Sequence, residues 1–171
     1  TIAWEAFVND LYRRGLTGKG VKLIVADGGA GLLAALPLVY PQIPLQRCWA
    51  HKIRNILNKA KKSDQKLMKP HLHRIMYARN RTQARKAARS FANHWQNICP
   101  KAVRCLRDDL DDLLSFLVFK DHSWRSATRT TNAIERRFRE VLRHYGSNIL
   151  MVAPWGKHLR AWPASEWQIV E

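Results

Sequence analysis

Two acidic residues, far apart in the sequence, have neighbours that suit a phosphoryl-transfer site. Asp27 ends the apolar run 23–26 and begins a Gly-rich turn, and Glu135 lies near the start of an amphipathic helical pattern. In α/β folds, ligands and catalytic groups commonly lie at the carboxyl end of a buried strand. Carboxylate oxygens are also the ligands that Mg²⁺ prefers. Asp27 and Glu135 are therefore candidate metal ligands.

Each acid also has a purely structural interpretation. Asp27-Gly28 is a common turn dipeptide, and Asn132 followed three residues later by Glu135 has the spacing of a helix capping box. The glycines that follow Asp27 match neither nucleotide-binding spacing, which excludes a phosphate loop of those kinds. Both interpretations of each acid stay open on the residues alone.

A second group of candidate residues lies between the two acids. Cys48 and His51 have the spacing of half a zinc site, but the other His and Cys residues lack the paired spacing that would complete it. The acidic run 108–112 is interpreted as a solvated helix face or a helix start rather than a metal cluster.

The charge of the chain points to a polyanionic partner. Thirty Lys and Arg against thirteen Asp and Glu give a net charge of +17 over 171 residues, and Asp64 is the one acid between Arg47 and Arg89. Dense basic surfaces bind nucleic acid because phosphate contacts release counterions. A solvated basic surface and a membrane-surface binder are the alternatives. Three irregularly spaced cysteines favour a reducing cytosol, and no apolar run is long enough to span a membrane.

Periodicity predicts an α/β protein rich in helices. Helices are expected over 1–15 and 32–36, the latter ended or kinked by Pro37, and a buried strand over 21–26 with an extended segment at 41–45. A helical period begins at Cys48, and further helices are expected at about 65–78, 82–98, 101–117 and 128–145. The predicted organisation is a core part (1–60), a helical insertion (61–124), a core helix with Glu135 (125–147) and a divergent tail (148–171).

Three stretches in this order resemble one family. They are Val25-Ala26-Asp27-Gly28 with Gly31-Leu32, Gln46-Arg47-Cys48-Trp49-Ala50-His51-Lys52-Ile53-Arg54-Asn55, and Arg129-Thr130-Thr131-Asn132-Ala133-Ile134-Glu135-Arg136. Together they are similar to the core of the Mutator-type bacterial insertion-sequence transposases, and the resemblance covers about residues 1–147.

The resemblance implies a ribonuclease-H-like fold with a helical insertion between the second Asp and the Glu of a metal-binding acidic triad. Asp27 matches the second Asp and Glu135 the Glu, while Cys48, His51 and Asn132 match residues that support the site. The expected cofactor is two Mg²⁺ or Mn²⁺ ions, which activate the attacking oxygen and stabilise the leaving oxygen. The cations expected to bind DNA are Arg47, Lys52, Arg54, Arg125, Arg129, Arg136, Arg137 and Arg139.

The expected partner is double-stranded DNA, both element ends and target, with a homo-oligomer for the full-length protein and a cytoplasmic, nucleoid-associated location. The family's first Asp has no counterpart here, because Glu5 and Asp10 before Asp27 both lie on the first expected helix. We therefore expect a catalytic-core fragment that is inactive by itself. The alternatives are a remnant that only binds DNA and a stand-alone ribonuclease-H-like nuclease.

Overall fold

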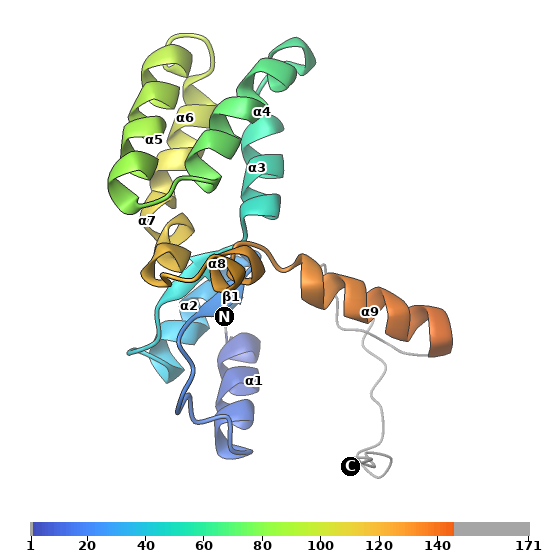
Figure 1. Ribbon diagram of the computed structural model, residues 1–171. Coiled ribbons are helices and arrows are strands. Elements are labelled where there is room, and N and C mark those ends of the chain that lie inside the picture. The colour runs from blue at the N-terminus through green and yellow to red at the C-terminus, as the bar shows by residue number, and fades with distance from the viewer. Residues whose placement is uncertain (1, 146–171) are drawn as a thin grey trace. The chain divides into compact units, whose positions relative to one another are not determined.

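The chain divides into two compact units, Thr1–Asn132 and Ala133–Glu171, and the computed structural model describes residues 2–145 (Figure 1). The predicted tail 148–171 lies outside the described residues. The helix-rich α/β class expected from the sequence is confirmed, with one two-stranded sheet among the described residues.

The sheet belongs to a compact strand–helix–strand unit. β1 (Ile24–Ala26) and β2 (Leu45–Arg47) pair in parallel, and α2 (Ala30–Val39) connects them. Helix α1 (Ile2–Arg13) packs on α2, where a Cβ at Gly31 would lie 2.6 Å from the Trp4 ring. The small core that results contains Val8, Ala26, Ala35, Leu36 and Tyr40.

Pro37 does not end the helix that contains it. α2 continues to Val39, although proline lacks the amide hydrogen that would reach the carbonyl four residues earlier. The apolar composition of this helix, which buries Ala35 and Leu36, gives it tertiary packing that compensates for the missing hydrogen bond.

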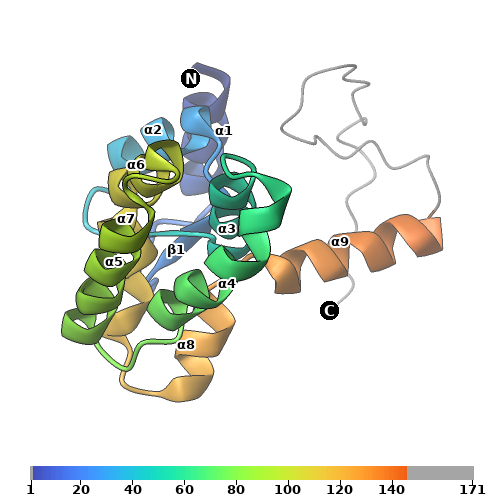
Figure 2. The same ribbon diagram turned by 90° about the horizontal axis from the view of Figure 1, so that it is seen from above.

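A bundle of four helices holds the larger core. Its helices are α3 (Trp49–Leu57), α4 (Lys62–Met76), α5 (Arg81–Trp95) and α6 (Pro100–Asp108). Figure 2 shows α4, α5 and α6 grouped together, with α3 beside α4. The helices bury one stripe each, and the side chains that fill the centre include Ile56, Met68, Leu72, Ile75, Phe91 and Leu106.

The helix expected over 101–117 is broken after Asp108. The chain continues as α7 (Leu110–Leu113), a 3-10 turn (Ser115–Val118) and α8 (His122–Thr128). Two buried polar side chains hold this irregular stretch. Nε2 of Gln46 and Nε1 of Trp49 donate to the Leu113 carbonyl at 3.1 and 2.8 Å, and the Phe116 amide donates to Oε1 of Gln46 at 2.8 Å. The stretch therefore connects β2 to the helical core through satisfied buried hydrogen bonds.

The second unit contains nearly all of α9 (Asn132–Tyr145), which begins four residues later than the sequence predicted. Ile134 at its start is 55% exposed. In the described part of the chain, every helix is too short or too polar to cross a membrane.

Candidate functional site

Asp27 lies at the carboxyl end of β1, where its side chain shapes the following turn. Oδ1 accepts a hydrogen bond from the Gly29 amide at 3.1 Å, and Gly28 has a φ of 109°, which favours glycine. A Cβ at Gly28 would also collide with the guanidinium of Arg47. The turn interpretation of Asp27-Gly28 is therefore confirmed, and it fixes the orientation of the carboxylate.

A charge cluster holds the Arg47 guanidinium above this turn. Nη1 of Arg47 lies 3.1 Å from Oδ1 of Asp109, and Nζ of Lys52 contacts Oδ2 of the same carboxylate. The side chains of Arg47, Lys52 and Asp109 are 14%, 6% and 18% exposed. Removing one partner of such a buried cluster leaves an uncompensated charge, which is strongly destabilising.

This cluster bears on two expectations. Arg47 and Lys52 were predicted to bind DNA, and the structure shows their charges facing Asp109 and largely shielded from solvent. The acidic run was interpreted as a solvated helix face or a helix start; α7 does begin at Leu110, directly after Asp109, and Asp109 is also the shared anion of the cluster. Nothing in the sequence distinguishes Asp109, because the leucine period continues through it without a break.

Cys48 joins three segments of the chain through its amide and its thiol. The Cys48 amide donates to the Ala26 carbonyl at 2.8 Å, which places Cys48 beside the end of β1. Cys48 precedes α3, and His51 on the first turn of that helix brings Nδ1 to 3.3 Å from Sγ. The amide and hydroxyl of Thr131 also lie 3.3 and 3.4 Å from Sγ. A thiol that donates to His51 and accepts from Thr131 satisfies these contacts.

The possible zinc site at Cys48 and His51 gains no further ligand among the described residues. Among the side chains that the structure describes, no group of three or more His, Cys, Asp or Glu is placed to hold a metal ion. The spacing of Cys48 and His51 instead brings their side chains together around Thr131, in the segment that leads to α9.

Arg129 anchors the same segment from its other side. Its carbonyl accepts from the Trp49 amide at 2.9 Å. Its guanidinium lies over the rings of Tyr77 and Phe116, 4.8 and 5.3 Å from their centroids. Arg129 is 8% exposed, and burial lowers the pKa of its guanidinium. Arg129 is therefore a buried cation that packs on two rings, and its predicted contact with DNA stays a prediction.

The other predicted cations have different surroundings. Arg54 is exposed on α3. Arg125 is half-buried, and its guanidinium donates to the carbonyls of Phe119 and, at 2.8 Å, Arg79. On α9, the exposed predicted cations are Arg136, Arg137 and Arg139.

The pairing of Asp27 with Glu135 stays a prediction. Asp27 belongs to the first unit and Glu135 to the second, and Asn132 ends the first unit at the start of α9. The first unit does bring the approach to α9 next to β1, because Cys48 contacts both Ala26 and Thr131.

Replacing Cys48 should release the segment that precedes α9. Cys48→Ala removes the acceptor of the Thr131 amide, so we expect a loss of roughly 1 to 2 kcal/mol in the free energy of unfolding and faster hydrogen exchange at Thr131. Cys48→Ser, which keeps an acceptor, should lose less. Urea unfolding and amide exchange measure these effects. Cys105→Ala, at a half-buried cysteine, is the control, and unchanged exchange at Thr131 in Cys48→Ala would contradict the interpretation.

Comparison with known proteins agrees with the motifs. The family model of the Mutator family of transposases matches residues 1–150. The transposase for insertion sequence element IST2 of Acidithiobacillus ferrooxidans is 43% identical over 139 residues, which are 81% of this chain and 46% of that protein. The transposase for IS6120 of Mycolicibacterium smegmatis is 34% identical, over 81% of this chain and 42% of its own length. This chain therefore spans less than half the length of these relatives, and it belongs to the Mutator family of transposases.

Proposed function

We propose that this chain forms part of the catalytic core of a transposase that cleaves and joins the DNA ends of an insertion sequence. The observation that carries the proposal is the junction at Cys48, whose backbone amide binds the carboxyl end of β1 and whose thiol binds the approach to α9. Each of these segments is followed by one of the two predicted metal ligands. Family membership supports the same function, because the relatives are insertion-sequence transposases.

Asp27 and Glu135 are the residues that would hold divalent metal ions. The Gly29 amide already holds Oδ1 of Asp27, so the carboxylate has a fixed orientation and can offer Oδ2 to a cation. Carboxylates in this position suit Mg²⁺ or Mn²⁺. When bound, such ions would supply Lewis-acid activation of the attacking oxygen and charge stabilisation at the leaving oxygen. The ribonuclease-H-like arrangement of the complete core is part of this proposal.

The second candidate function is DNA binding without catalysis. It is favoured by the placement of the acids before Asp27. Glu5 and Asp10 both lie on α1, and Asp10 pairs at 3.5 Å with Arg14, which directly follows that helix. Neither Glu5 nor Asp10 lies on a strand beside Asp27, so residues 2–26 do not offer the third carboxylate of the triad.

DNA binding by this chain should depend steeply on salt. Each phosphate contact contributes roughly 0.9 to the slope of log affinity against log salt concentration. Replacing Arg136, Arg137 and Arg139 together by Ala should lower the slope by about two to three, measured by fluorescence anisotropy with duplex DNA.

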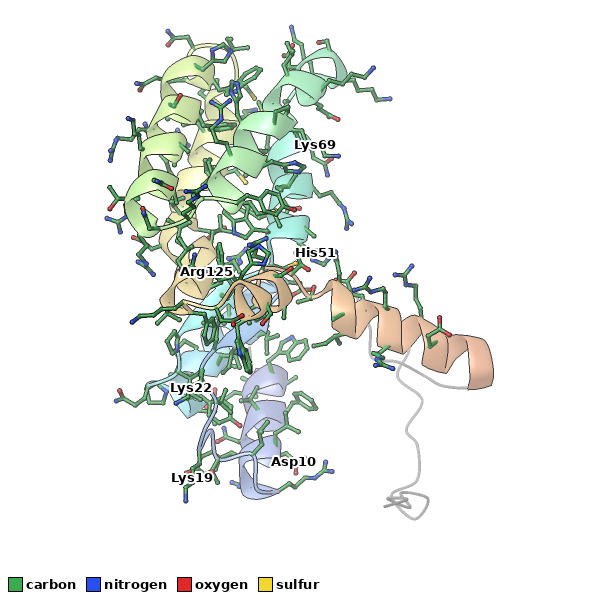
Figure 3. All side chains as sticks on the ribbon, viewed as in Figure 1. Asp10, Lys19, Lys22, His51, Lys69 and Arg125 are labelled. Atoms are coloured by element: carbon green, nitrogen blue, oxygen red, sulfur yellow. The ribbon has the colours of Figure 1, made fainter. Side chains whose placement is uncertain are left out.

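The control removes three positive charges elsewhere, with Arg13, Lys19 and Lys22 replaced by Ala. These exposed residues belong to α1 and the loop that follows it, and Figure 3 shows Lys19 and Lys22 near that end of the first unit. The control variant should keep most of the slope. Equal losses in the two variants, or a flat salt dependence of the wild type, would contradict the assignment of the DNA contacts.

Strand joining should be negligible for this chain by itself, because residues 2–26 place no acid on a strand beside Asp27. The measurement is Mg²⁺-dependent joining of labelled DNA ends to a target duplex, with Asp27→Ala as the control for the site. Joining that Asp27→Ala abolishes would show that two acids suffice. Random nicking without end joining would instead favour a nuclease.

A further inference from the structure

A basic groove on the helical bundle contains an exposed aromatic ring that the proposed function does not yet use. The groove has a volume of about 440 Å³ and is lined by residues from the end of α4, the loop that follows it and α5. Its cations are Arg74, Arg79 and Lys86, and Tyr77 supplies the ring. Among the described residues, none that lines the groove is acidic.

Two neighbouring side chains hold the ring of Tyr77 in place. The Arg129 guanidinium lies 4.8 Å from its centroid, and His73 packs edge-on with ring centroids 5.8 Å apart. The Tyr77 amide donates to the His73 carbonyl at 2.8 Å, which fixes the backbone at the end of α4. Tyr77 is nevertheless 57% exposed. Arg129 covers one face of the ring, and the opposite face is the one on which a base could stack.

The loop at the end of the groove is equally well anchored. Asn80 caps α5 by accepting from the Gln83 amide at 2.8 Å, and the Arg79 amide donates to Oε1 of Gln83 at 3.3 Å. The Arg79 carbonyl in turn accepts from Arg125 of α8 at 2.8 Å. Because these residues are already ordered, binding a ligand here costs little conformational entropy.

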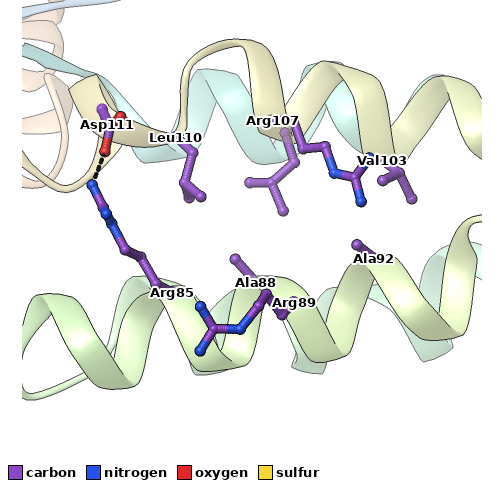
Figure 4. A pocket seen from close by; sticks show the side chains of 9 residues that line it. Arg85, Ala88, Arg89, Ala92, Val103, Arg107, Leu110 and Asp111 are labelled. Atoms are coloured by element: carbon purple, nitrogen blue, oxygen red, sulfur yellow. Dashed lines mark hydrogen bonds and ion pairs between the residues drawn. The ribbon is translucent and has the colours of Figure 1, made fainter.

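A second basic groove differs from the first in the residues that line it. It lies between α5 and α6, has a volume of about 290 Å³ and contains Arg85, Arg89 and Arg107 (Figure 4). Asp111 lies at its edge and pairs with Arg85 at 2.7 Å (Figure 4), and its lining includes no aromatic ring. Cations alone suit a phosphate backbone, whereas an open ring beside cations suits a base together with its phosphates.

We propose that the groove around Tyr77 binds an unpaired nucleotide of the DNA, with the base stacked on the open face of Tyr77 and the flanking phosphates on Arg74, Arg79 and Lys86. Aromatic stacking accepts every base, because each has a π face. Arg129 connects this groove to the candidate site, since it supports the ring and lies two residues before Thr131. The inference rests on the proposed action on DNA.

The test uses the full chain and a duplex with a single-stranded gap that contains one 2-aminopurine. Stacking on Tyr77 should quench the fluorescence of this base in the wild type and in Tyr77→Phe. Tyr77→Ala should lose the quenching and weaken binding to gapped DNA roughly five- to a hundred-fold, while its affinity for intact duplex stays close to the wild-type value.

Charge variants provide a test that leaves the ring and its contacts in place. Replacing Arg74, Arg79 and Lys86 by Ala should weaken binding to gapped DNA more than to duplex. Replacing Arg85, Arg89 and Arg107 by Ala removes the same charge from the other groove and should weaken both equally. If Tyr77→Ala quenched the 2-aminopurine fluorescence as strongly as the wild type, this inference alone would be overturned. The same holds if the two charge variants weakened binding to gapped DNA equally. If the wild type showed no salt-sensitive DNA binding, the proposed function itself would be overturned.

Discussion

The organisation of the candidate site depends on one buried cysteine. The thiol of Cys48 accepts hydrogen bonds from the amide and hydroxyl of Thr131, more than eighty positions away in the sequence, and its amide extends the hydrogen bonding of the parallel strand pair onto Ala26. A sulfur atom is a weak hydrogen-bond acceptor, so the contacts work together rather than through one strong bond. The Trp49–Arg129 backbone hydrogen bond, one residue further on, supports the same junction. Together these contacts link the segment before α9 to the strand that precedes Asp27.

The positive charges of the chain have two kinds of surroundings that composition cannot separate. Lys52 and Arg129 are buried, one against Asp109 and the other against aromatic rings, and both hold the fold together near the candidate site. Arg54 on α3 and Arg136, Arg137 and Arg139 on α9 are exposed, as the proposed contacts with a phosphate backbone require. Basic residues are therefore internal cations in one place and exposed charges in another, and burial rather than sequence position decides between them.

Local patterns in the sequence predicted the strand before Asp27, the helices of the bundle and the proximity of Cys48 to His51, because each depends on periodicity or on spacing within one helical turn. The break after Asp108 was missed, since it depends on Arg47 and Lys52, which lie far away in the sequence, and on the buried hydrogen bonds of Gln46. Pro37 was expected to end or kink its helix, yet the helix continues to Val39 because packing of that helix outweighs one lost hydrogen bond. Long-range partners of this kind leave no periodic trace in a single sequence.

We propose that Asp27 and Glu135 are neighbours in the folded chain. A direct measurement is cross-linking of Asp27→Cys to Glu135→Cys with a short thiol-reactive cross-linker, in a chain that carries Cys105→Ser because Cys48 and Cys99 are buried. Asp10→Cys paired with Glu135→Cys is the control, since Asp10 is on α1. We predict an intramolecular cross-link for the first pair under native conditions, its loss in urea, and none for the control pair. Two reactive thiols at positions 27 and 135 that fail to cross-link in the folded chain would contradict the account.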